Sequence, residues 1–184
     1  MNELKELEYT IVEEDAVSDE LDRALRDALV VCFPKDGDHF LHQRWWHSLH
    51  NRTVVATERD GSVAGALCVI ERMILVGESR LNIAGIGNVC TVPPWRKKGI
   101  IDCIMAMALD EAKRRGFETG LLFCKPELEK VYTRMGWKRI DATVVMDDEH
   151  GVKVPLPEND VTMWIPILAD RFPPGDIDLL GRNW

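Results

Sequence analysis

The segment Asn88-Val89-Cys90-Thr91-Val92-Pro93-Pro94-Trp95-Arg96-Lys97-Lys98-Gly99-Ile100-Ile101 decides the fold that we expect. Before the two prolines, apolar residues follow the period of two that is typical of a strand. After them the period is about 3.6. One apolar helical face is then formed by Ile100, Ile101, Ile104, Met105, Ala108, Leu109 and Ala112. The segment is therefore predicted to be a strand that turns directly into a helix.

Such a corner is suited to binding an anion. The first N–H groups of a helix have no partner within it, and the helix dipole places positive charge at the same end. Arg96, Lys97 and Lys98 form the only tight cationic triplet ahead of a helix in this acidic chain. We therefore predict a diphosphate site here. Neither a GxxxxGK[ST] loop nor a GxGxxG motif is present, which disfavours a nucleoside-triphosphate or dinucleotide fold.

Upstream of the corner, the sequence predicts helices and an antiparallel meander. Ser18 is expected to cap a helix that ends before Pro34, and His39–His50 is expected to be a second helix or a helical loop. The Asp60-Gly61 pair supplies the positive φ of a tight hairpin. The expected strands are Leu7–Val12, Thr53–Glu58, Val63–Ile70, Met73–Val76 and Leu81–Val92. Within the last of these, Gly85 and Gly87 indicate a bulge or a close approach of the backbone.

Downstream of the corner, strands and one more helix complete the expected fold. They are a strand at Thr119–Cys124, a helix from Pro126 to Met135, and two closing strands at Trp137–Met146 and Val161–Ile167. The fold class is mixed α/β (α+β), as one domain over residues 1–184. We expect a central, mostly antiparallel sheet of about seven strands flanked by about four helices.

Composition limits the classes of partner. The 184 residues are 46% hydrophobic, which suffices for one sizeable core, and the net charge is −8. This charge argues against nucleic acid and favours a cationic partner such as a polyamine or an aminated sugar. The five cysteines show no C-x-x-C spacing, so reduced core thiols are expected and no metal is predicted. No basic leader or membrane-spanning run is present, which favours a cytoplasmic protein.

Two motifs resemble those of the GNAT superfamily of acyl-CoA N-acyltransferases. Arg96-x-x-Gly99-x-Ile101 is similar to the family's (Q/R)-x-x-G-x-(G/A) signature, with Ile101 in place of the final small residue. Tyr132-Thr133-Arg134-Met135-Gly136-Trp137 resembles the Y-x-x-x-G-(F/W) end of motif B. The resemblance implies one GNAT-like domain with a parallel pair of strands splayed at the cofactor, and acetyl-CoA as the acyl donor.

The resemblance also implies roles for particular residues. The cofactor would be bound by Val89, Cys90, Thr91, Arg96, Lys97, Lys98, Gly99, Ile100 and Ile101. The N–H of Val89 would donate to the thioester carbonyl as an oxyanion donor. Tyr132 would protonate the leaving thiolate, because a phenol with a pKa near 10 can donate a proton without itself being charged. From spacing alone, a core aromatic residue is an equally good interpretation of Tyr132.

Residues expected to contact the acceptor are Glu71, Glu78, Asn88, Trp46 and Trp184. Many relatives have a carboxylate on the strand before the turn, whereas Asn88 can orient a water but cannot act as a base. Glu71, Glu78 and the terminal carboxylate of Trp184 are substitutes, and each is also explained as a solvated surface charge. The histidines His39, His42, His47 and His50 share no helical face and are expected to form a wall of the acceptor site.

Within the superfamily, the whole chain looks like the aminoglycoside 2′-N-acetyltransferases and the NodA-type N-acyltransferases. The supporting stretches include Trp46-His47-Ser48-Leu49, Val69-Ile70-Glu71-Arg72 and the strand Val161–Ile167. The expected reaction is direct acetyl transfer to a primary amine of a small, cationic acceptor such as an aminoglycoside or an amino sugar. Transfer of a longer acyl chain, and a non-catalytic acyl-CoA-binding sensor, stay open as alternatives, and so does a homodimer.

Overall fold

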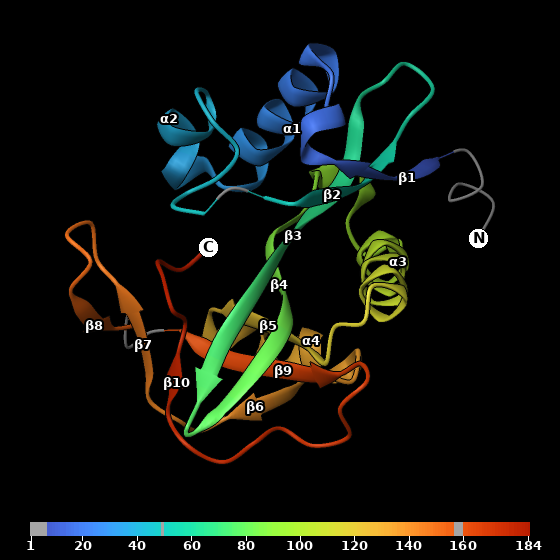
Figure 1. The fold of residues 1–184 in the computed structure, drawn as a ribbon. Coiled ribbons are helices and arrows are strands. Elements are labelled where there is room, and N and C mark those ends of the chain that lie inside the picture. The colour runs from blue at the N-terminus through green and yellow to red at the C-terminus, as the bar shows by residue number, and fades with distance from the viewer. Residues whose placement is uncertain (1–6, 49, 157–159) are drawn as a thin grey trace. The chain divides into compact units, whose positions relative to one another are not determined.

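The computed structural model describes residues 7–48, 50–156 and 160–184, so Leu49 of the Trp46–Leu49 stretch lies outside the described residues. The chain divides into two compact units, Met1–Val69 with Gly87–Ala108 (unit 1), and Ile70–Ile86 with Leu109–Trp184 (unit 2). Three elements run from one unit into the other, namely β3 (Val63–Val76), β4 (Ser79–Thr91) and α3 (Ile100–Arg114) (Figure 1). None of the helices in the described ranges is long and apolar enough to span a membrane.

Unit 1 contains an antiparallel meander, helices α1 and α2, and the N-terminal part of α3. Its elements are β1 (Glu8–Glu13), η2 (Glu14–Ala16), α1 (Asp19–Cys32), η3 (Pro34–Asp36), α2 (Gly37–Phe40), β2 (Arg52–Thr57) and η4 (Pro93–Trp95), with the first part of β3 and the last part of β4. Strand β1 pairs antiparallel with β2 from Glu8 opposite Thr57, and β2 pairs antiparallel with β3. The predicted hairpin is confirmed.

Helix α1 begins where the sequence predicts. The Ser18 side chain accepts a hydrogen bond of 3.2 Å from the N–H of Leu21, which satisfies one of the unpaired donors of the first turn. Its apolar face packs in a core cluster of unit 1 that contains Leu25, Ala28, Leu29, Phe40, Val55, Val63, Ala66 and Cys90. Burial of this face is what stabilises the helix against the sheet of the unit.

The second predicted helix is mostly wrong. Helix α2 ends at Phe40, and the described residues from Leu41 to β2 are turns and irregular structure. Arg44 lies in this stretch and is 3% exposed, with its side chain in ion pairs of unit 1. A buried guanidinium is costly unless it is paired, and the backbone of this irregular stretch places Arg44 where it meets two carboxylates.

Unit 2 contains the other strands and helix α4. They are β5 (Thr119–Cys124), η5 (Pro126–Leu128), α4 (Glu129–Arg134), β6 (Lys138–Ile140), β7 (Val144–Asp147), β8 (Lys153–Pro155), β9 (Val161–Pro166) and β10 (Ile177–Asp178). The hydrogen-bonded order is β6-β9-β5-β4-β3-β10-β7-β8. Strands β4 and β5 form the predicted parallel pair, from Ile83 opposite Thr119 to Ile86 opposite Leu122. The core of the unit includes Ile74, Ile83, Leu121 and Ile177, all fully buried.

The mixed α/β class with four α-helices is confirmed, but the sheet has more strands than predicted. The described residues form ten, because the predicted strand Trp137–Met146 divides into β6 and β7 and because β8 and β10 were not expected. In the other direction, the predicted strands Val63–Ile70 and Met73–Val76 are one continuous strand, β3. Strand β6 pairs with β9, whereas β7 pairs with β8 and β10. Asp141, Ala142 and Thr143 lie between the two pieces and belong to neither strand.

Candidate functional site

Strand β4 bends at Asn88, shortly before it ends. Asn88 has a φ of 48°, a left-handed conformation that is uncommon for residues other than glycine but tolerated by asparagine. A left-handed residue within a strand interrupts the regular pleat. The sequence predicted an irregularity from Gly85 and Gly87, but the positive φ belongs to the next residue. Val89, the expected oxyanion donor, follows the bend directly.

A short turn joins the end of β4 to the N-terminus of α3. It contains η4 and then two left-handed residues, Lys97 with a φ of 62° and Gly99 with a φ of 85°. The N–H of Cys103 donates to the carbonyl of Gly99 at 3.2 Å. The N–H groups that precede Cys103 therefore have no carbonyl further back in the helix to bind. Their direction suits an anion at this end of α3.

Cationic side chains surround the same turn. Arg96, Lys97 and Lys98 are exposed, and the Nε of Arg96 donates to the carbonyl of Thr91 at 3.1 Å, which ties the turn to the end of β4. The Nζ of Lys98 lies 4.8 Å from the centre of the Trp95 ring. The hydroxyl oxygen of Thr91 is buried and has no hydrogen-bond partner in the described part of the chain. Three cations and a helix N-terminus on one exposed turn fit a diphosphate group.

The residues expected to bind the cofactor, Val89, Cys90, Thr91 and the segment Arg96–Ile101, all belong to unit 1, and the bond from Arg96 to the Thr91 carbonyl joins their two parts. The structure also adds a thiol that sequence reasoning missed. A hydrogen bond with the Cys90 thiol, followed by the guanidinium of Arg96, lowers the pKa of Cys32 to about 7 despite partial burial. The hydrogen bond with Cys32, together with burial, raises the pKa of Cys90. Because Cys32 ends α1, far from the corner in sequence, no motif indicated this contact.

A buried polar cluster lies beside the bend of β4. The side chain of Arg44 forms ion pairs with Glu14 (2.5 Å) and Asp22 (2.7 Å) and donates to the Thr53 hydroxyl at 3.3 Å. The side-chain nitrogen of Asn88 donates to the main-chain carbonyl of Arg44 at 2.5 Å. Arg44 was not singled out in the sequence, because nothing local distinguishes it from a surface arginine.

The four histidines have different surroundings. His50 is 6% exposed, and burial followed by the charge of Arg44 lowers its pKa to about 3, so the ring is neutral. Its Nε2 lies 3.5 Å from the side-chain nitrogen of Asn88. His39 stacks on Trp46 with ring centres 3.8 Å apart, whereas His42 and His47 are exposed. No group of metal-ligating side chains is arranged to hold a metal ion in the described ranges.

Tyr132 belongs to unit 2, on α4. Its side chain is 7% exposed, and its ring meets that of Trp137 edge to face at 6.3 Å. Burial, and to a smaller extent the neighbouring Cys124, raises the pKa of the Tyr132 phenol. The phenol therefore keeps its proton throughout the neutral pH range, as a proton donor requires.

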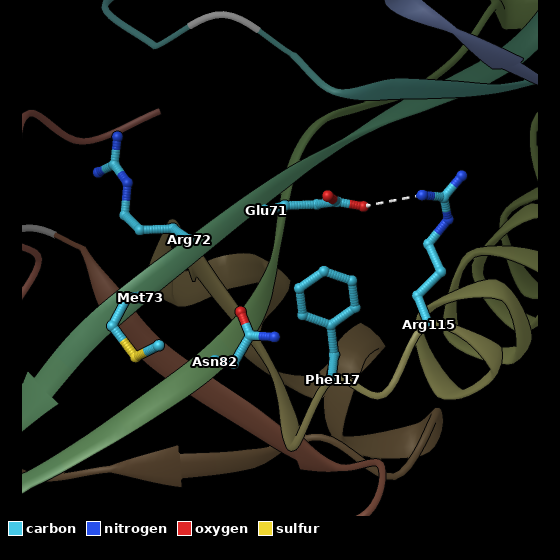
Figure 2. A pocket seen from close by; sticks show the side chains of 6 residues that line it. All are labelled: Glu71, Arg72, Met73, Asn82, Arg115 and Phe117. Carbon is cyan, nitrogen blue, oxygen red and sulfur yellow. Dashed lines mark ion pairs between the residues drawn. The ribbon is translucent and has the colours of Figure 1, made fainter.

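The other expected acceptor residues of unit 2 lie in separate surroundings. Glu71 lines a pocket of about 430 Å³ and pairs with Arg115 at 3.8 Å, and Figure 2 shows it pointing toward Arg115 while Arg72 points away. Glu78 is exposed in the turn between β3 and β4. The indole nitrogen of Trp184 donates to the carbonyl of Ile86 at 3.1 Å.

Trp184 also explains Gly85. A Cβ on Gly85 would lie 2.7 Å from the Cζ2 atom of the indole, closer than real side chains approach. The glycine thus marks a close approach, which was one of the two predictions for this position.

Comparison with known proteins gives the family. Residues 15–140 match the model of the acetyltransferase (GNAT) domain. A search of curated proteins found no match. Among solved structures, the chain is similar to a GNAT family N-acetyltransferase from Escherichia coli in complex with CoA, with a TM-score of 0.63 and 18% identity over 94% of this chain and 90% of that one.

Two further structures have the same fold. One is a GNAT family acetyltransferase from Brucella melitensis in complex with acetyl-CoA, with a TM-score of 0.59 and 17% identity over 92% of this chain and 94% of that one. The other is the ribosomal-protein-S18-alanine N-acetyltransferase of Escherichia coli, with a TM-score of 0.56 and 16% identity over 87% of this chain and 94% of that one. At these identities the likeness concerns the fold.

The match to the domain model covers well over half of the sequence, and the chain belongs to the GNAT acetyltransferase family. It is accordingly an acyl-CoA-dependent N-acetyltransferase, the class that the two sequence motifs indicated.

Proposed function

We propose that this protein transfers the acetyl group of acetyl-CoA to a primary amine of a small, cationic acceptor by direct attack. The observation that carries the proposal is the corner from Thr91 to Ile101, where the N-terminus of a 15-residue helix follows a turn with three exposed cations. The class of acceptor rests on the net charge of −8, which attracts cationic amines, and on the resemblance to enzymes that act on aminoglycosides.

The corner binds the diphosphate in this proposal. The main-chain N–H groups at the start of α3 donate to it, and Arg96, Lys97 and Lys98 neutralise its charge. Gly99, with its φ of 85°, keeps the turn in the required conformation, since a side chain in this conformation is strained. Ile101, which stands where the family signature has a small residue, is half-buried.

Acetyl-CoA, when bound, supplies the acetyl group as an activated thioester. Val89 donates its N–H to the thioester oxygen, where negative charge develops as the amine attacks. Tyr132 gives its proton to the departing sulfur, and its raised pKa ensures that the proton is present. No covalent enzyme intermediate is needed.

The acceptor amine must lose a proton before it attacks. Because the side-chain nitrogen of Asn88 is bonded to the Arg44 carbonyl, its carbamoyl oxygen can accept a hydrogen bond from the amine or from a water. An amide is not a base, so the proton of the amine passes through that water to solvent. Glu71, Glu78, Trp46 and Trp184 are proposed as further acceptor contacts. Of the two carboxylates Glu78 is the more exposed, whereas Glu71 already has Arg115 as a partner.

Two measurements test the proposal. Calorimetric titration with CoA and with pantetheine, which lacks the diphosphate, should give at least tenfold tighter binding of CoA in the parent protein. Gly99→Val should remove most of that difference, and Gly61→Val, at a hairpin glycine, serves as the matched control. Release of free thiol is then followed with acetyl-CoA and a panel of aminoglycosides, polyamines, amino acids and peptide amines. Equal affinity for CoA and pantetheine would refute the diphosphate site.

A further inference from the structure

The bend of β4 depends on a residue that is unusual for its conformation. Asn88 is one of three non-glycine residues with positive φ in the described ranges, and it alone lies within a strand. Backbone of this kind persists only where the surroundings hold it, and it tends to occur where a site requires it. We therefore expect contacts that hold Asn88 in its left-handed conformation, and the structure contains them.

Two contacts fix the side chain of Asn88. Its nitrogen donates to the Arg44 carbonyl at 2.5 Å and lies 3.5 Å from the Nε2 of His50. The ring of His50 is neutral, and we assign its proton to Nδ1, so that Nε2 can accept from the Asn88 amide. Both hydrogens of the amide group are then directed toward acceptors, and rotation of the side chain would lose both contacts.

The side-chain contacts of Arg44 hold its main-chain carbonyl in place. The Arg44 side chain reaches Glu14 of η2 and Asp22 of α1, and it donates to Thr53 of β2. A guanidinium that is 4% exposed and paired on two sides cannot move without leaving a charge buried and unpaired. The irregular segment after α2 thereby presents a fixed acceptor to the bend.

We propose that Asn88 is a positioning residue of the acyl transfer: its side-chain amide, held by the Arg44 carbonyl and the His50 ring, fixes the left-handed bend of β4 and so aims the N–H of Val89. The inference deepens the proposed function and rests on it. The peptide plane that carries the Val89 N–H is attached directly to the Cα of Asn88, so the backbone angles of Asn88 set its direction. A donor that is oriented before the reaction stabilises developing charge without reorganisation.

The test compares two substitutions at position 88. Asn88→Ala removes the amide and disfavours positive φ, whereas Asn88→Gly removes the amide but adopts positive φ readily. We expect Asn88→Ala to lower kcat by about tenfold or more. This loss is smaller than that caused by removing an oxyanion donor, because the Val89 N–H is misdirected and not removed. The affinity for CoA, measured by calorimetry, should change by less than about threefold, because the corner is untouched. KM for the amine should rise equally in the two variants, because both lack the Asn88 oxygen proposed to contact the acceptor, so the difference in kcat between them reports the backbone conformation. Asn88→Gly should be at least about three times faster than Asn88→Ala.

The controls separate positioning from general damage. Leu180→Ala changes another left-handed residue, with a φ of 51° and outside any strand, and should leave kcat unchanged. Thermal unfolding and CoA affinity report whether each variant is folded. Two results would overturn the role of Asn88 without touching the proposed function. They are full activity of Asn88→Ala, and a rate for Asn88→Gly that is no higher than that of Asn88→Ala. A parent protein that releases no thiol with any amine would overturn both proposals, since Asn88 would then position nothing.

Discussion

Protonation of His50 should destabilise the protein in mildly acidic solution. The ring is 6% exposed and faces the charged side chain of Arg44, so a proton on it would bury a second positive charge. Its pKa is about 3 in the folded protein and 6.5 in the reference state. Between these two values the unfolded chain binds more protons, so stability rises with pH in that window and is lost as pH falls.

The size of the effect follows from the two pKa values. Well inside this pH window the unfolded state binds one more proton than the folded state. The free energy of unfolding then changes by about 1.4 kcal/mol per pH unit. Integrated from pH 7 to pH 5, a group that titrates at 6.5 unfolded and near 3 folded loses about 2 kcal/mol of stability. That is a substantial fraction of the stability of a typical domain.

The assay is urea unfolding at pH 7 and pH 5 for the parent and for His50→Gln. Glutamine does not titrate, and its side-chain oxygen can accept from Asn88 where Nε2 now lies. Nearby carboxylates such as Glu14 titrate in both proteins, so the difference between the two pH dependences isolates His50. The parent should lose about 2 kcal/mol more than the variant. Equal losses would mean that His50 is not held neutral in the fold, and the reasoning about its contact with Asn88 would fail.

Three other results are expected. Tyr132→Phe should lower kcat about tenfold to a hundredfold in a thiol-release assay while CoA affinity stays within about threefold; an unchanged kcat removes the role of proton donor. Alkylation of Cys32 by iodoacetamide should speed up about tenfold per pH unit below pH 7 and level off above it, because the thiolate reacts and the pKa is about 7. The site is identified by Cys32→Ser, and a rate that still rises tenfold from pH 7.5 to 8.5 contradicts the assignment. Gly85→Ala should cost about 1–3 kcal/mol in urea unfolding, because its Cβ would meet the ring of Trp184; the same cost in a Trp184→Ala background would exclude the clash.

Local chemistry predicted several elements of the fold well. Ser18 caps α1, β5 spans the predicted Thr119–Cys124, and α3 begins at the predicted Ile100. In each case the deciding interactions lie within a few residues along the chain. Strand β10 could not be predicted in this way, because Ile177 is a strand residue only through its pairing with Val76 and Val144. The division of Trp137–Met146 into two strands likewise depends on partners far along the chain.

The candidate site divides in the same manner. Arg96, Gly99 and the start of α3 are contiguous, so a motif could indicate them. Cys32, Arg44 and His50 were not assigned roles correctly, since their pKa values and contacts come from residues brought close by folding. Asn88 was singled out for its lack of a carboxylate, but its left-handed φ was not predicted; the sequence indicated only a bulge or a close approach at Gly85 and Gly87.

The sequence by itself determined the family, the strand that turns into a helix and the cationic turn between them, because helix capping, hydrophobic periodicity and a contiguous motif act over short stretches of chain. Only the tertiary structure decided which side chains are buried with which partners. Burial and charge pairing depend on distance in space, and they are what make His50 neutral, fix Arg44 and hold the bend at Asn88.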